Sequence, residues 1–390
     1  MSTTELASLQ RTSVAPVKVS SRLLSVDVYR GLSVAGMLLV DYQGDESASY
    51  WGLHHPKWNG WSTADLVFPS FLFLTGVSIV LAYSARLQRG ETRAQIARHA
   101  ATRTILLVGL AIFLNGVPDF NLATWRIEGV VQRIAICYLI AGLLFLWTGS
   151  RGLIVTAGAC LVGYWALLCF APVPGIGVPG RDVPFLAPDR NLVDWLDRAV
   201  FPGRLWNGTH DPEGILSTIP AVATALMGVL TGQWLRSNRG QQMKAQAMLM
   251  GGILAVVLGL VWSRWFPINK NLWTSSFVLL TVGIALIALA MLYWIVEVRQ
   301  RRGPWTTPFV VFGSNAIIAY CLDETLWVLF ARPYAHAADG SIISWQQHFN
   351  GSLEKVLSPA NASLVFAMGA VLLCWLLMLI LYRKRIFVKF

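Results

Sequence analysis

The segment Tyr50–Trp61 combines groups that can move protons with flat aromatic faces. His54 and His55 are adjacent in it, and imidazole is the side chain whose ordinary pKa suits acid–base catalysis near neutral pH. Trp58 and Asn59 follow, and a Trp ring offers a large apolar face on which a pyranose could stack. A solvated histidine pair beside an interfacial aromatic belt would use the same residue types. The segment is therefore either a catalytic, sugar-binding loop or an ordinary membrane interface.

Two further polar clusters come just before apolar runs. Asp211 and Glu213 flank a proline, which suits the first turn of a helix, so helix capping explains them as well as substrate contact does. Lys270 and Asn271 come next to Trp273, shortly before another apolar run. A cation, amides and free helix N–H groups favour a phosphate or carboxylate site.

Polar residues inside apolar runs are the other candidates, because each costs at least about 2.5–3.5 kcal/mol at the centre of a membrane span. Arg133 is the deepest of them, and a buried guanidinium needs an anion. That anion is either a carboxylate such as Asp65 or a phosphate of a ligand. The remaining members of this group are Asp41, Asn115, Gln132, Arg264, Asn315, Asp323 and Glu324.

The elements that position these residues are apolar runs long enough to cross a bilayer. Hydrophobic residues make up 55% of the 390 residues and charged residues only 13%. About ten runs reach the length of roughly 20 residues that a transmembrane helix needs. The sequence therefore predicts an all-α polytopic membrane protein whose helices span the lipid bilayer. The predicted spans are about 25–44, 64–84, 102–118, 127–148, 152–171, 214–235, 245–266, 274–296, 308–331 and 362–382.

The basic residues gather in alternate loops, and the net charge is +11. The positive-inside rule places those loops and both termini in the cytoplasm. The excess of basic residues therefore follows from the membrane topology, and no nucleic-acid partner is expected. The opposite loops, at about 44–63, 172–213 and 332–361, are then extracytoplasmic, with a short helix near 191–200 capped by Asn191. Residues 1–20 are polar and predict a disordered cytoplasmic tail. Residues 21–390 form a single transmembrane domain.

Several motifs resemble the transmembrane acetyltransferases related to heparan-α-glucosaminide N-acetyltransferase. The most specific is the string Pro-Ile-Asn-Lys-Asn-Leu-Trp-Thr-Ser at 267–275, and the next is His-Pro-Lys-Trp-Asn-Gly at 55–60 followed by Asp-Leu-Val-Phe-Pro at 65–69. Other matches are at 22–31, 131–133, 211–214 and 313–315. The chain is similar to the bacterial branch, and it departs from the family at Asp41, where relatives commonly carry Asn.

The resemblance implies an acetyl-CoA-dependent N-acetyltransferase whose acceptor is the amine of a glucosamine-like sugar on the extracytoplasmic side, with no metal. His55 is then the catalytic residue, acting as a base or as a transient acetyl carrier, and Asp41 or Asp65 orients its imidazole. Asn59, Asn271 and Asn315 are candidates for stabilising the oxyanion. Arg133 and Lys270 suit the CoA phosphates, with Asn271, Trp273 and Asn315 in the same CoA-binding set. The residues expected to contact the acceptor are Trp58, Asn59, Asp211 and Glu213.

The resemblance further implies a multi-pass protein of the bacterial inner membrane and a homodimer. A transporter for amino sugars or N-acetylated sugars would use the same outward-facing cavity without chemistry, and it remains the alternative. Substituting His55 by alanine separates the two, because it abolishes turnover of acetyl-CoA in an acetyltransferase only.

Overall fold

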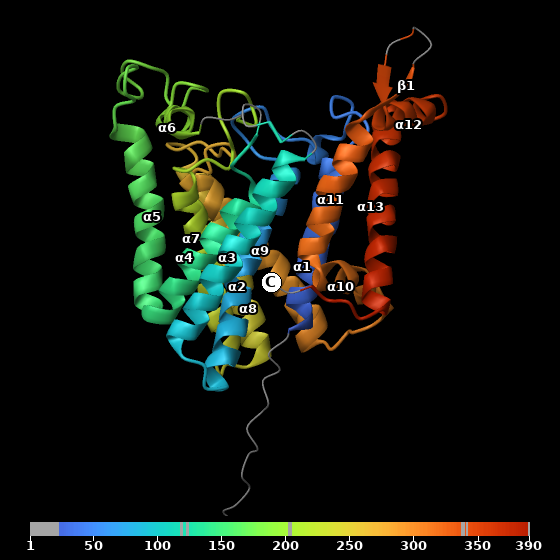
Figure 1. The fold of residues 1–390 in the computed structure, drawn as a ribbon. Coiled ribbons are helices and arrows are strands. Elements are labelled where there is room, and N and C mark those ends of the chain that lie inside the picture. Colours follow the sequence, from blue (N-terminus) through green and yellow to red (C-terminus); the bar gives the residue numbers. More distant parts are fainter. Residues whose placement is uncertain are drawn as a thin grey trace, which may run out of the picture.

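The computed structural model describes residues 23–117, 120–121, 125–201, 205–336, 340 and 342–388, and it is almost entirely helical (Figure 1). The tail predicted at 1–20 lies outside the described residues. The α-helices are α1 Leu24–Asp41, α2 Val67–Gln88, α3 Arg93–Gly116, α4 Val130–Trp147, α5 Ser150–Phe170, α6 Leu192–Val200, α7 Thr218–Arg236, α8 Gln241–Trp262, α9 Ser275–Tyr293, α10 Thr307–Ser314, α11 Ala316–Ala331, α12 Trp345–Glu354 and α13 Pro359–Arg383. Short 3₁₀ helices are η1 Trp51–Leu53, η2 Ala64–Leu66 and η4 Pro304–Thr306, and a π-helical turn, η3 Trp294–Val298, ends α9.

Each predicted span contains a helix, which confirms the fold class. Within the described residues, eight helices are long and apolar enough to cross a membrane by themselves. A ninth predicted span, 308–331, is not continuous, because α10 and α11 meet at Asn315 with a bend of 74°. The helix α1 corresponds to the remaining predicted span, 25–44. Its 18 residues include three charged side chains, Asp27, Arg30 and Asp41.

The break at Asn315 is stabilised by the C-terminal segment. After α13 the chain returns to the middle of the bundle (Figure 1). There Asn315 Nδ2 donates to the carbonyl of Ile386 at 2.7 Å, and the Val388 amide donates to Asn315 Oδ1 at 3.0 Å. The Asn315 side chain thus replaces helix hydrogen bonds that a bent span would leave unmade inside a membrane.

The helices form two apolar groups that share α1. One core contains α2, α3, α4, α5, α7, α8 and α9, and a second contains α10, α11 and α13. Within the first group α2 and α7 pack backbone to backbone at Gly76 and Gly228, where a Cβ atom would overlap a main-chain carbonyl of the neighbouring helix. Such close approach fixes the start of α2, which bears part of the candidate site.

The three long loops lie together at one end of the bundle, here named the loop end (top of Figure 1). The loop 172–213 contains α6, and the Asn191 side chain accepts from the Asp194 amide, which confirms the predicted cap. The loop after α11 forms an antiparallel pair of strands, β1 Pro333–His336 and β2 Ile342–Ser344, before α12.

Candidate active site

His55 is held by Asp65 at the loop end. His55 Nδ1 lies 2.6 Å from Asp65 Oδ1, and the Asp65 side chain is fully buried. A carboxylate only accepts hydrogen bonds, so Nδ1 carries the proton and Nε2 carries the lone pair. Asp65 Oδ2 also accepts from the Ser62 amide at 2.9 Å, so one carboxylate holds both the loop and the imidazole. Of the two acids predicted to orient His55, the structure places Asp65 there.

Lys270 is the third member of this cluster. Its Nζ lies 3.0 Å from His55 Nε2, 3.2 Å from His55 Nδ1 and 3.6 Å from Asp65 Oδ1. Because Nζ is almost equidistant from both ring nitrogens, the ammonium lies against the face of the imidazole and not in line with the Nε2 lone pair. Lys270 was predicted to bind CoA phosphates, but in this structure it contacts the imidazole.

The turn at 267–274 positions Lys270 through hydrogen bonds of its own. Asn269 Oδ1 accepts from the Leu272 amide at 2.9 Å, and Thr274 Oγ1 accepts from the Asn269 amide at 3.1 Å. Trp273 adopts a φ of 49°, a left-handed conformation that is unusual for a bulky residue and costs about 1–3 kcal/mol. Complete burial of the Trp273 ring against Phe68 holds this turn in place.

The turn and the His55 loop are joined directly. The Gly60 amide donates to the Ile268 carbonyl at 2.8 Å, and Asn269 Nδ2 donates to Asn59 Oδ1 at 3.2 Å. Two motifs more than 200 residues apart therefore form one structure. Asn59 is exposed and follows His55 in the same loop, and Asn271 is half-buried and follows Lys270.

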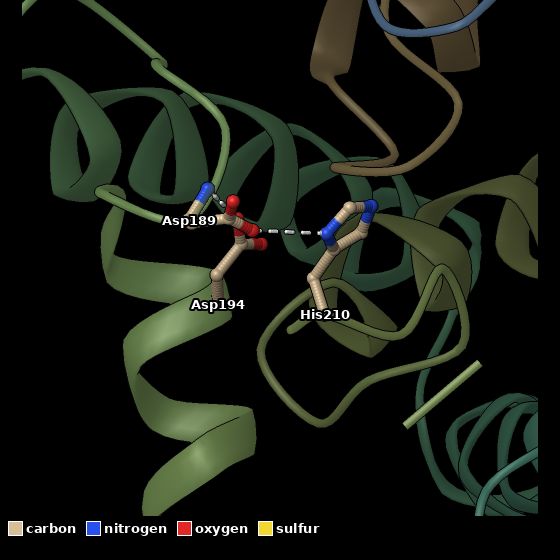
Figure 2. Close-up of side chains that lie close together, drawn as sticks. All are labelled: Asp189, Asp194 and His210. Carbon is tan, nitrogen blue, oxygen red and sulfur yellow. Dashed lines mark hydrogen bonds and ion pairs between the residues drawn. The ribbon is translucent and has the colours of Figure 1, made fainter. Parts of the chain in front are cut away.

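Trp58 faces the loop that contains α6. Its Nε1 donates to the Leu186 carbonyl at 2.9 Å, and its ring meets the His210 ring edge to face at 5.2 Å between centroids. His210 belongs to a cluster with Asp189 and Asp194, in which Nδ1 lies 3.3 Å from Asp189 Oδ1 (Figure 2).

These three side chains could supply metal ligands, since one ligand atom from each lies within 4.8 Å of the others. The sequence analysis missed the cluster because its spacing matches no metal motif. Asp189 reaches it through a left-handed backbone conformation, with a φ of 65°. The cluster contacts Trp58 through the His210 ring.

Asp211 and Glu213 both bind Arg126, a residue that the sequence analysis did not select. Arg126 Nε and Nη2 donate to the two Asp211 oxygens at 2.7 and 2.6 Å, and Nη2 also donates to Glu213 at 2.5 Å. Burial favours a raised pKa for Asp211, but the guanidinium and two backbone amides outweigh it and hold the pKa below its ordinary value. This network joins the segment before α4 to the segment before α7.

Arg133 lies below that network and is 1% exposed. Its Nη2 donates to the Gly214 carbonyl at 2.8 Å and to Ser217 Oγ at 2.5 Å, and its guanidinium covers the Trp273 ring at 5.2 Å. Among the described residues it forms no ion pair, so of the two anions considered from the sequence, a carboxylate such as Asp65 is not its partner. Its Nε and Nη1 have no hydrogen-bond partner.

A cavity of about 890 Å³ lies between the two helix groups. Residues from α1, α2, α3, α4, the α10–α11 break and the C-terminal segment line it, and Asn315 is among them whereas Arg133 and Trp273 are not. Its charged lining is mostly basic and lies toward the end opposite the loops. The basic lining residues are Arg30, Arg86, Arg89, His99 and Arg103.

Asp27, the only carboxylate in the described lining, pairs with Arg30, and Glu91 outside the lining pairs with Arg86 and Arg89. Among the described residues Arg103 has no such partner. Arg103 covers the Tyr138 ring at 5.0 Å, and its Nε is buried without a hydrogen-bond partner. An orphaned buried guanidinium nitrogen fits an anionic ligand such as a phosphate. The sequence analysis attributed these arginines to the positive-inside rule alone.

Comparison with known proteins agrees with this geometry. Residues 22–265, more than half of the chain, match the family model described as "Heparan-alpha-glucosaminide N-acetyltransferase, catalytic". The chain is 29% identical over 427 residues to heparan-alpha-glucosaminide N-acetyltransferase of Mus musculus, covering 95% of this chain and 61% of the relative. It is 30% identical over 424 residues to the Homo sapiens protein of the same name, with 94% and 60% covered.

The chain thus spans about 60% of the length of the curated relatives it matches. The match confirms the resemblance inferred from the motifs, and it supports an acyltransferase. Together with the apolar helices, it identifies the chain as a multi-pass integral membrane protein of the family of heparan-α-glucosaminide N-acetyltransferase catalytic regions.

Proposed function

We propose that this protein transfers an acetyl group from acetyl-CoA to the amine of a glucosamine-like sugar at the loop end. The observation that carries the proposal is the His55–Asp65 pair, in which Asp65 at 2.6 Å leaves the Nε2 lone pair of His55 available for chemistry. The printed names of the relatives describe an N-acetyltransferase acting on a glucosaminide, in agreement with this proposal.

Acetyl-CoA enters through the basic cavity from the cytoplasmic end. Arg30, Arg86 and Arg103 suit the phosphates of CoA, because guanidinium groups bind phosphate oxygens with two parallel hydrogen bonds. The long pantetheine arm then extends along the cavity toward the loop end. This route solves a topological difficulty, since CoA is made in the cytoplasm and is too polar to cross lipid.

In the direct route the amine nitrogen attacks the thioester carbonyl, and His55 Nε2 accepts the proton that the amine loses. The carbon–sulfur bond then breaks, and His55 returns the proton to the CoA thiolate. In the alternative route Nε2 itself attacks the carbonyl, CoA leaves as the thiol, and the amine takes the acetyl group from the imidazole. In either route the ammonium of Lys270 lies beside Nε2, close enough to stabilise the developing oxyanion.

The acceptor sugar lies against the loop end. The half-buried Trp58 and the exposed Asn59 belong to the same loop as His55, so they can contact a sugar whose amine is at the imidazole. Asp211 and Glu213 contribute indirectly, since their oxygens already bind Arg126.

The test is release of CoA thiol by the purified protein in lipid nanodiscs, with acetyl-CoA and glucosamine as substrates. We expect turnover in the wild-type protein and loss of at least about 10³-fold in His55→Ala, by comparison with catalytic histidines in other acyl-transfer enzymes. Uptake of labelled glucosamine into proteoliposomes without CoA release would instead indicate the transporter.

Sidedness is tested with sealed vesicles. Inverted membrane vesicles should use external acetyl-CoA, and right-side-out vesicles should use only acetyl-CoA loaded inside them. The opposite pattern would contradict the proposed entry of CoA through the basic cavity.

A further inference from the structure

Three carboxyl groups gather where α1 ends against α11. Asp41 is the last residue of α1, and Asp323 and Glu324 are adjacent in α11. Tyr42 joins the two helices, because its buried hydroxyl donates to the main-chain carbonyl of Asp323 at 2.5 Å. The carboxyl groups of Asp41 and Asp323 lie within hydrogen-bonding reach of each other, and Glu324 is close enough to interact electrostatically with both.

The positive charge around this acidic group is small. Among the described residues, no Lys, Arg or His forms an ion pair with Asp41, Asp323 or Glu324. Asp323 is only 5% exposed, and its Oδ1 atom is buried without a hydrogen-bond partner. Unpaired carboxyl oxygens at membrane depth are costly and mark sites where a polar or cationic ligand binds.

The acidic group lies between the cavity and the imidazole. On the cavity side, Tyr320 lines the cavity and hydrogen-bonds to Glu324. On the other side, Asp41 is exposed and lies within electrostatic range of Lys270, whose Nζ contacts His55 Nε2 at 3.0 Å. A ligand atom held by these carboxyl groups would therefore lie beside both the acetyl donor and the catalytic base.

We propose that Asp41, Asp323 and Glu324 bind the ammonium group of the acceptor sugar and thereby select acceptors that carry an amine. This inference rests on the proposed acetyltransferase function and adds the group that recognises the acceptor. A sugar amine is mostly protonated near neutral pH, so it arrives as a cation that matches three carboxyl groups. It must then lose one proton to solvent before it attacks the thioester, and His55 accepts the second proton as the nitrogen attacks.

The experiment compares two nitrogen acceptors that differ in charge. At pH 7.0 glucosamine is mostly cationic, whereas hydroxylamine is mostly a neutral nucleophile that also takes an acetyl group. KM values for both are measured in the wild-type protein, in Asp323→Asn and in Glu324→Gln, with the rate of His55→Ala subtracted as background. Asp45→Asn is the matched control, because Asp45 is an acid of the same loop end whose carboxylate accepts hydrogen bonds from its neighbours Ser47 and Ala48.

We expect the ratio of the glucosamine KM to the hydroxylamine KM to rise about tenfold or more in each variant and to stay unchanged in Asp45→Asn. A merely structural defect would change both KM values together, and that result, or an unchanged ratio, would overturn the inference. If Asp323→Asn does not fold, as judged by loss of its melting transition, Glu324→Gln decides the question.

The two proposals fail in different ways. If the wild-type protein acetylates neither acceptor, the acetyltransferase function is contradicted, and so is the amine site that rests on it. A wild-type protein that acetylates both acceptors while the variants keep the normal ratio contradicts the amine site alone. A further outcome concerns inhibition by added Na⁺ or Ca²⁺. If these ions inhibit acetylation of hydroxylamine as strongly as that of glucosamine, the acidic group binds inorganic cations, and this result also contradicts the amine site.

Discussion

Asp65 Oδ1 lies 2.6 Å from His55 Nδ1, although the two residues come from different elements. Asp65 is in η2, which leads into α2, and His55 is in the loop before it. The carboxylate is fully buried, whereas the imidazole is about a third exposed. An acid in this position fixes the tautomer of the histidine and stabilises the imidazolium that forms when it takes a proton.

Replacing Asp65 by asparagine should therefore reduce kcat far more than it changes binding. An amide at this position can donate to Nδ1 and thereby stabilise the tautomer with its proton on Nε2, which is the wrong one for a base. By analogy with the same change in serine proteases, we expect a loss of about 10³–10⁴-fold in kcat. The measurement is CoA release with saturating acetyl-CoA and glucosamine.

The matched control is Asp182→Asn, which changes an acid that pairs only with its neighbour Arg181 and with the chain around it. Its kcat should equal that of the wild type. If Asp65→Asn retains more than a tenth of the wild-type kcat, the carboxylate does not orient the imidazole.

Lys270 is predicted to contribute through its charge. Its Nζ lies 3.0 Å from His55 Nε2 and should move to the oxyanion when the thioester arrives. Lys270→Met removes the donor and should lower kcat by about 10²–10³-fold, which is the usual cost of losing one oxyanion donor. Lys270→Arg keeps the charge and should recover part of this loss. Equal losses in both variants would argue for a packing role.

Lys57 provides the comparison for that experiment. It is exposed in the same loop as His55, and the same substitution by methionine there should leave kcat unchanged. A similar loss at both lysines would indicate a general electrostatic effect of the loop end rather than a specific contact at Nε2.

The basic cavity leads to a prediction about acetyl-CoA. Arg103 lines the cavity, and its Nε is buried without a hydrogen-bond partner. Arg103→Gln should raise the KM for acetyl-CoA by about tenfold, the effect of losing one charge-assisted hydrogen bond, and should leave the glucosamine KM unchanged. Arg98 lies on the same helix, is exposed and does not line the cavity, so Arg98→Gln is the control. A higher KM for glucosamine instead would place the sugar in this cavity.

Much of this architecture could be predicted from the sequence, because hydrocarbon thickness sets the length of an apolar run. Every predicted span contains a helix, and the cap at Asn191 is present. The break at Asn315 could not be predicted in the same way. It depends on hydrogen bonds with Ile386 and Val388, and those partners are more than 70 residues away in the chain.

The types of residue in the candidate site could be predicted from the sequence, but the contacts between them could not. The sequence left Asp41 and Asp65 as equal candidates to orient His55, because the loop between spans could return to either acid. It also placed Lys270 with the CoA phosphates, since a lysine near amides resembles an anion site. The contact of Lys270 with His55 depends on the turn at 267–274, whose strained Trp273 is stabilised by burial and by hydrogen bonds that form only in the folded protein.

The loop end should also make stability depend on pH through Asp197. Asp197 is fully buried in α6, and its Oδ2 has no hydrogen-bond partner. Burial raises the pKa of this carboxyl group from 3.8 to about 7. The folded chain therefore holds a proton that the unfolded chain has already released, and this favours folding at low pH. The favourable contribution shrinks as the pH rises from about 4 and is lost above about 7.

Asp197→Asn keeps the acceptor for the Ile215 amide, which Asp197 Oδ1 binds at 3.0 Å, and removes the charge. We expect its melting temperature to exceed that of the wild type by several degrees at pH 8 and by clearly less at pH 5, measured in the same detergent. Glu128 titrates in the same range, because burial also raises its pKa to about 7, so the difference between variant and wild type is the quantity to compare. A difference that is constant from pH 5 to pH 8 would mean that Asp197 is ionised throughout, and Arg133, which interacts with it electrostatically, would then be its counterion.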